Sequence, residues 1–163
     1  MHSSQHKKSL AHRGREFKCP FCKRKFKSPS GIALHIESGF HKITRHHVTT
    51  AVRSLNIVPN ITIKRITGPI HLPILYTYIA TEASFNGSAY QCFMCYKPFQ
   101  TLAGLNGHLN SPAHDGDEFR CPKCKTGFKL ISGLFQHLES GSCGLVKNNQ
   151  IKKLTGKFSR LTL

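Results

Sequence analysis

Acidic residues are scarce in this sequence, and long hydrophobic runs are missing. Only 7 Asp and Glu accompany 24 Lys and Arg, so the formal net charge is +17. The longest apolar run, residues 74–80, is far shorter than the roughly 20 apolar residues that a membrane-spanning helix needs. No N-terminal segment has the apolar core of a signal peptide. These features predict a soluble protein whose partner is a polyanion, nucleic acid before an anionic membrane surface.

Tryptophan is also missing, and cysteine occurs in an odd number, seven. Disulfide pairing would leave one thiol over, whereas every cysteine has a place in a metal-ligand pattern described below. A chain that keeps all its cysteines as thiols belongs in a reducing compartment. We therefore expect an intracellular protein that uses its cysteines to bind metal.

Three segments of the chain carry the same ligand pattern. Each begins with Cys-x2-Cys, places a His after a further 12 residues, and adds a His or Cys after five more. The three candidate sets are Cys19, Cys22, His35 and His41; Cys92, Cys95, His108 and His114; and Cys121, Cys124, His137 and Cys143. A closed tetrahedral Zn²⁺ site takes four such thiolate and imidazole ligands. The spacing predicts three structural zinc ions.

A pair of apolar residues accompanies each ligand set at fixed places between the ligands. The pairs are Phe26 and Ile32, Phe99 and Leu105, and Phe128 and Leu134. A segment of about 25 residues buries too little apolar surface to fold alone. Structural zinc contributes roughly 10–16 kcal/mol in such peptides, so metal binding and folding should occur together.

This combination of ligands and apolar positions resembles the C2H2-type zinc finger. The resemblance implies a small zinc-stabilised α+β fold, with one ββα unit around each Zn²⁺. We name the units finger one (residues 17–41), finger two (90–114) and finger three (119–143); finger three is a variant, because Cys143 replaces the last His. The sequence of residues 17–39 recurs in residues 119–141 at a constant offset of 102. The repeat includes a closing Glu-Ser-Gly, in which it resembles the fingers of an uncharacterised fungal group.

The segments outside the fingers carry weaker patterns. Residues 1–16 predict a disordered basic arm, and residues 144–163 a basic amphipathic tail. In the insert, residues 42–89, an apolar stripe predicts a helix from Thr44, followed by strands over residues 60–66 and 70–83. Asn86-Gly87 predicts a tight turn that folds residues 81–85 onto 88–91 and adds a strand to the sheet of finger two.

The basic residues of fingers one and three are candidates for phosphate contacts. They are Lys23, Arg24, Lys25, Lys27, Lys123, Lys125 and Lys129. In DNA-reading members of the family, three positions of each finger helix touch successive bases. Of the nine residues at these positions here, only Gln136 has a side chain suited to base edges. The sequence therefore predicts backbone contacts with weak base recognition.

We therefore expect a nuclear, transcription-factor-like protein that binds nucleic acid, with DNA favoured over RNA. The five-residue spacing between the last two ligands of fingers one and two resembles matrin-type fingers, so double-stranded RNA is the first alternative. Finger two is nearly uncharged and could instead bind a protein together with the insert, which makes an interaction scaffold the second alternative. An enzyme is not expected, because four protein ligands leave zinc no open position for a reacting water.

Overall fold

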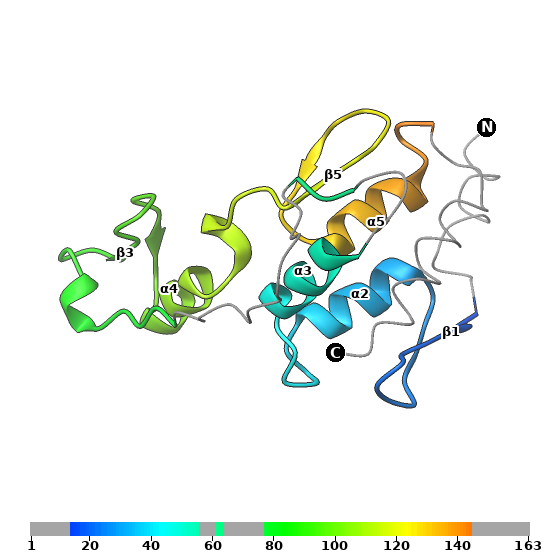
Figure 1. Cartoon of the computed structure of the whole chain (residues 1–163). Coiled ribbons are helices and arrows are strands. Elements are labelled where there is room, and N and C mark those ends of the chain that lie inside the picture. The colour runs from blue at the N-terminus through cyan, green and yellow to red at the C-terminus, as the bar shows by residue number, and fades with distance from the viewer. Residues whose placement is uncertain (1–13, 56–60, 64–76, 145–163) are drawn as a thin grey trace, which may run out of the picture. The chain divides into compact units, whose positions relative to one another are not determined.

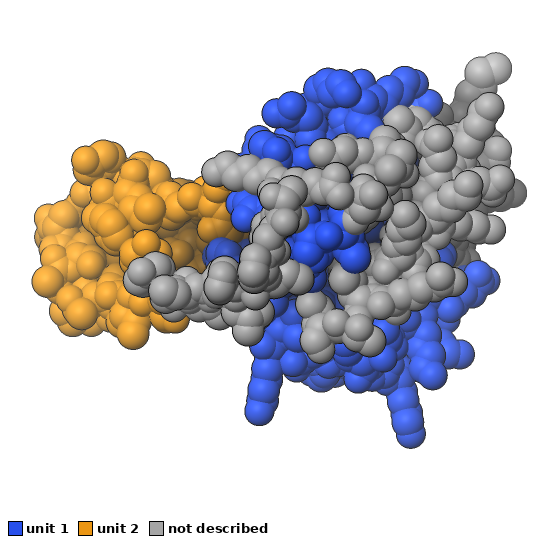
Figure 2. Space-filling model, viewed as in Figure 1, with its two compact units in different colours: residues 1–73, 117–163 blue, residues 74–116 orange. Residues whose placement is uncertain are grey.

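The computed structural model describes residues 14–55, 61–63 and 77–144, and the chain divides into two compact units. Unit 1 comprises residues 1–73 and 117–163, and unit 2 comprises residues 74–116 (Figure 2). Fingers one and three therefore belong to the same unit, although they are far apart in sequence. Most of the expected basic arm and nearly all of the amphipathic tail lie outside the described residues. Among the helices that are described, none is long and apolar enough to cross a bilayer.

Each finger folds as a short antiparallel hairpin followed by a helix, which confirms the expected ββα fold (Figure 1). Finger one contains β1 (Phe17–Lys18), β2 (Lys25–Phe26) and α2 (Pro29–Glu37). Finger two contains β3 (Tyr90–Gln91), β4 (Pro98–Phe99) and α4 (Leu102–Leu109). Finger three contains β5 (Phe119–Arg120), β6 (Gly127–Phe128) and α5 (Ile131–Ser140).

The three hairpins share one register because the same residue types occupy the same positions. Two aromatic residues face each other across each pair of strands: Phe17 and Phe26, Tyr90 and Phe99, and Phe119 and Phe128. In each finger the backbone N–H of the first Cys donates to the carbonyl five residues later, at 2.9–3.0 Å. This bond closes the turn that holds both cysteines on one side of the hairpin.

The helices begin in different ways. Ser28 accepts a hydrogen bond from the backbone N–H of Gly31, and Pro29 follows it at the first helical position, a combination that favours the start of a helix. Thr101 plays the same part for α4. Leu130, which precedes α5, has no side chain that can accept such a bond. The N-terminus of α5 is capped instead by Glu37 of finger one, whose carboxylate accepts from the backbone N–H groups of Ile131 and Ser132.

Unit 1 has one core to which both of its fingers contribute. Helices α2 and α5 pack against each other along their lengths (Figure 1). The buried residues of this core are Cys19, Ile32, Ala33, Ile36, Val48, Val52, Ile61, Phe119, Cys121, Ile131, Leu134, Phe135 and Leu138. Two fingers that sequence spacing describes as separate units are thus one folded body.

The first part of the insert completes this core. Helix α3 (Arg45–Ser54) follows Thr44 and buries Val48 and Val52. Ile61 is also buried, and residues 61–63 run beside the hairpin of finger three, where Arg120 donates its backbone N–H to the carbonyl of Ile61 at 2.8 Å. Arg53 forms an ion pair with Glu118. The remainder of the strand expected over residues 60–66 lies outside the described residues.

Unit 2 is a single finger with the last part of the insert attached to it. Its core is small: Ala80, Cys92, Leu105 and Leu109, with Tyr90, Phe99 and Leu102 packed around them. The side-chain amide of Asn106 bonds both backbone groups of Ala80, so the insert docks on α4. The strand expected over residues 70–83 is wrong at its end, where Glu82–Ser84 forms a 3-10 turn (η2). The pairing expected at Asn86-Gly87 is reduced to one bridge, between Phe85 and Tyr90.

Candidate metal centres

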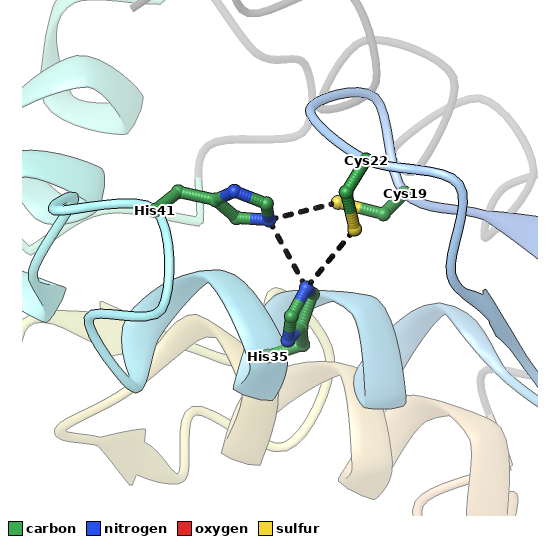
Figure 3. A group of neighbouring side chains, drawn as sticks. All are labelled: Cys19, Cys22, His35 and His41. Carbon is green, nitrogen blue, oxygen red and sulfur yellow. Dashed lines mark hydrogen bonds between the residues drawn. The ribbon is translucent and has the colours of Figure 1, made fainter.

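The structure brings the four predicted ligands of finger one together at one point (Figure 3). The Sγ atom of Cys19 lies 3.3 Å from Nε2 of His41, and Sγ of Cys22 lies 3.5 Å from Nε2 of His35. The two Nε2 atoms lie 3.0 Å apart. Tetrahedral zinc with Zn–S of about 2.3 Å and Zn–N of about 2.0 Å separates its ligand atoms by roughly 3.3–3.8 Å. Both Sγ–Nε2 separations of finger one fall in this range, and the Nε2–Nε2 separation is slightly shorter, so the four donor atoms surround a space that suits one zinc ion.

Finger two repeats this geometry almost unchanged. Its two Sγ–Nε2 separations, Cys92 to His114 and Cys95 to His108, are 3.3 and 3.4 Å, and its two Nε2 atoms are again 3.0 Å apart. Two imidazoles that bind one zinc ion through Nε2 are brought into such close contact. A shared cation resolves the arrangement in both fingers.

Finger three forms the variant site that the sequence predicts. The Sγ atoms of Cys121 and Cys143 lie 3.8 Å apart, and Sγ of Cys124 lies 3.3 Å from Nε2 of His137. The separation of the two sulfur atoms is the one expected for two thiolates on a tetrahedral zinc. In all three groups the ligand atoms lie within 4.8 Å of one another.

A serine that sequence reasoning overlooked ends the ligand-bearing helix in every finger. Ser38, Ser111 and Ser140 each lie three residues after the first His ligand and donate their hydroxyl to its carbonyl at 2.7–2.8 Å. The chain then turns back, through positive φ at Gly39 and Gly141 and through a 3-10 turn (η3, Pro112–His114) in finger two. The recurring Ser at this spacing was a visible signal, because hydroxyl groups compete with helical backbone bonds.

Local electrostatics favour the metal-binding forms of several ligands. Burial lowers the pKa of His35 and of His108, which keeps both rings neutral and able to coordinate. The pKa of Cys124 is lowered to about 6, first by a hydrogen bond from the Thr126 hydroxyl and then by the Thr126 backbone N–H. Burial raises the pKa of Cys121, so the thiols of one site start from different protonation states.

The comparison with known proteins agrees with this geometry. Residues 17–41 match the family model described as zinc finger, C2H2 type. Finger one is a C2H2-type zinc finger. No curated protein and no solved structure matches the chain. Fingers two and three share the fold and the ligand geometry of finger one, so the protein carries three structural zinc sites.

The predicted phosphate-binding residues lie on the hairpin side of fingers one and three. In finger one, three of them (Arg24, Lys25 and Lys27) line a hollow of about 480 Å³ together with Arg15 and Phe26. Lys23 is exposed and does not line it. The Arg24 guanidinium also lies 4.2 Å from the centre of the Phe40 ring, a cation–π contact that holds it beside the hollow. In finger three, Lys123 and Lys125 are exposed and Lys129 is half-buried.

The helix side of the same two fingers is largely covered. Ala33 of α2 and Phe135 of α5 are buried where the two helices pack together. Leu34, at 57% exposure, and Gln136 remain open to solvent. Sequence reasoning could not foresee this cover, because the spacing within one finger contains nothing about the packing of another.

Proposed function

We propose that the protein binds nucleic acid chiefly through its phosphate backbone, using the basic hairpins of unit 1. The observation that carries the proposal is the basic hollow of finger one, where four cationic side chains surround a phenylalanine. Such a cluster attracts phosphate without regard to sequence, and the formal charge of +17 extends this attraction over the whole chain.

The packing of α2 against α5 supports backbone contacts over base contacts. DNA-reading fingers lay their helices in the major groove one after another. Here the two helices bury part of their surfaces on each other. Gln136 is the one exposed side chain among the base-contacting positions that matches a base edge well. We propose DNA as the target and a nuclear, transcription-factor-like role; RNA duplex is the alternative, since its phosphates offer the same contacts.

Four protein ligands at each zinc site support a structural rather than a catalytic role for the metal. A catalytic zinc keeps one position open for water or substrate. The spacing of the ligand atoms in all three fingers suits a closed site. We therefore propose no enzymatic activity for these centres.

The test is the salt dependence of binding to a DNA duplex. Replacing Lys23, Arg24, Lys25 and Lys27 by Ala should flatten the slope of log affinity against log salt by roughly 2–4 units, since each phosphate contact contributes about 0.9. Lys97→Ala, which removes an exposed cation from finger two, is the control and should leave the slope almost unchanged. Binding that ignores salt in the wild-type protein would refute the proposal.

A second candidate function, protein binding, is favoured by the surface of unit 2. Phe93 is 65% exposed and Tyr96 is 72% exposed, and Tyr78 and Met94 lie open to solvent as well. Exposed aromatic residues and Met are typical of the centre of a protein interface. We propose that unit 2 contacts a protein. Replacing Phe93 and Tyr96 by Ser should abolish such an interaction without changing the salt slope of nucleic-acid binding.

A further inference from the structure

Fingers one and three are related by an internal two-fold symmetry. Glu37, near the end of α2, accepts from the backbone N–H of Ser132 at the start of α5 at 3.3 Å. Glu139, near the end of α5, accepts from the backbone N–H of Ser30 at the start of α2 at 2.8 Å. Each glutamate is 102 positions from the other, and so is each serine. A contact that is repeated in both directions between equivalent residues is the mark of a two-fold relation.

The reciprocal caps fix the geometry of the pair. Because the C-terminal turn of each helix meets the N-terminal turn of the other, α2 and α5 are antiparallel. The equivalent positions Ile36 and Leu138 are both buried in the shared core, and so are Ala33 and Phe135, where a small residue in one helix is matched by a large one in the other. The repeated wording of the two fingers therefore corresponds to a repeated packing surface.

Each hairpin lies on the side of its own helix that faces away from the helix pair. Helix α2 contacts β1, β2 and α5, and helix α5 contacts β5, β6 and α2. Figure 1 shows the two hairpins on opposite sides of the α2 and α5 pair. The symmetry thus places one hairpin at each outer flank of unit 1.

Three pairs of cationic residues obey the same symmetry, whereas Arg24, Lys25 and Lys123 have no cationic counterpart. Lys18 corresponds to Arg120 and Lys23 to Lys125, and all four side chains are exposed. A third pair, Lys27 and Lys129, is half-buried. None of these six residues is a zinc ligand or caps a helix. Two matched sets of cationic side chains therefore lie at the two flanks, although Nζ of Lys125 also donates to the carbonyl of Pro122.

We infer that unit 1 binds a nucleic-acid duplex with its own two-fold axis along the dyad that relates the two strands of the duplex. One basic hairpin then contacts each strand of the duplex. The antiparallel strands of a duplex are related by two-fold axes perpendicular to the helix, and a protein of matching symmetry can make the same contacts to both. Phosphates carry this symmetry whatever the base sequence is, so no palindromic site is needed. A single strand has no such axis. This inference rests on the proposed function and narrows its target to duplexes.

The first experiment compares matched variants on a DNA duplex of arbitrary sequence at several salt concentrations. Lys18→Ala and Arg120→Ala should each flatten the salt slope by about 0.9, and the double variant by about twice that amount. Lys23→Ala and Lys125→Ala form a second matched pair with the same expectation. Lys97→Ala in finger two is the control. Native mass spectrometry showing three zinc ions in each variant would establish that the fingers are still folded.

The outcomes separate the inference from the proposal on which it depends. If the finger-one variants weaken binding and the finger-three variants do not, the protein grips nucleic acid from one end and the symmetry has no role in binding. If one chain binds two duplexes rather than one, the hairpins act separately and the inference is equally wrong. If wild-type protein shows no salt-dependent binding to any nucleic acid, the proposed function itself fails.

A second experiment uses the partner as the variable. The wild-type protein is titrated with a DNA duplex and with a single strand that has the same total number of phosphates; an RNA duplex forms a third arm. We expect at least tenfold tighter binding to the duplexes than to the single strand. Equal affinity for duplex and single strand would overturn the inference, whichever sugar the duplex carries.

Discussion

Finger one in unit 1 and finger two in unit 2 hold their four ligands in nearly the same geometry, yet their helices lie in different surroundings. Helix α4 covers a core of four buried residues, whereas α2 contributes to a core of thirteen that α3 and finger three share. Zinc and a local apolar pair are therefore enough to form the ββα unit. What the unit does next depends on residues outside the metal pattern.

The hairpin surfaces differ as much as the helix surfaces. After the second cysteine, finger one continues Lys23-Arg24-Lys25, and finger two continues Tyr96-Lys97-Pro98. Between its two cysteines finger two exposes Phe93 and Met94. Charge attracts a polyanion over a distance, while exposed aromatic groups favour close contact with an apolar surface. The same metal frame thus presents two kinds of surface in one chain.

The largest expected difference between the units concerns the loss of zinc. Cys22→Ala and Cys95→Ala remove the same ligand from fingers one and two. Loss of the zinc ion lowers the free energy of unfolding of a finger by on the order of 10 kcal/mol. Cys95→Ala should unfold unit 2 alone, because its core has no other support. Cys22→Ala should also weaken α5, through the shared core. Amide exchange of both variants measures the spread of unfolding, and equal spread in the two would contradict the comparison.

A smaller loss of stability is expected from replacing Phe135, whose burial depends on the core that fingers one and three share. Phe135 is buried between the fingers of unit 1, and Phe135→Ala should lower the free energy of unfolding of unit 1 by about 3–5 kcal/mol. Unit 2 should keep its stability and its zinc. Urea unfolding followed by amide signals from each unit would show the difference. A loss below about 1 kcal/mol would mean that the two fingers do not pack as described.

Removing a cap should cost less again. Glu37→Ala leaves two buried backbone N–H groups of α5 without a partner, at about 1–3 kcal/mol in unit 1. Glu139→Ala should cost less, because Glu139 is more exposed and its partners are one backbone N–H and the hydroxyl of Ser30, which can bind water instead. Glu82→Ala in unit 2, which loses an exposed bond from the Tyr90 hydroxyl, is the control. Equal losses for Glu37 and Glu82 would show that the reciprocal caps contribute nothing special.

The smallest predicted effect lies within one zinc site. The pKa of Cys124 is lowered to about 6, with the hydrogen bond from the Thr126 hydroxyl as the largest cause, so most of the thiol is ionised at neutral pH. Thr126→Ala should raise that pKa, and protons should then compete with zinc at a higher pH. The midpoint of acid-induced zinc release should move up for finger three and stay fixed for fingers one and two. A zinc-sensitive dye or mass spectrometry measures the release of zinc. A shift of the midpoint in all three fingers would contradict a local cause.

The sequence predicted the features that spacing controls. The twelve ligands, the hairpins and the helices follow from Cys-x2-Cys pairs, the aromatic positions and the cap at Ser28, and helix α3 follows from its apolar stripe. The pairing of α2 with α5 could not be predicted in this way, because it depends on which helix faces meet in space. The repeat at an offset of 102, which includes the Glu and the Ser, was the visible sign that the two fingers are related. That these residues cap each other's helices became clear only from the contact of Glu37 with Ser132 in the structure.

The short strands around finger two were the least predictable part. A β-strand is stabilised by the strand it pairs with, and the local sequence does not show which strand that is. The sequence of residues 81–85 is therefore compatible with a strand or with a turn. The structure settles on a 3-10 turn at Glu82–Ser84 and a single bridge at Phe85. Much of the predicted extended run lies in residues 64–76, outside the described part of the chain.

The central claim is that fingers one and three form one symmetric body while finger two folds alone. The most direct test is the hydrogen-exchange protection of three amides in Cys22→Ala: Ile131 and Ser132, which donate to Glu37, and Leu105, which lies in α4. The structure predicts that Ile131 and Ser132 lose protection although their own zinc site is intact, and that Leu105 is unaffected. Full protection of Ile131 and Ser132 in this variant would show that finger three folds without finger one.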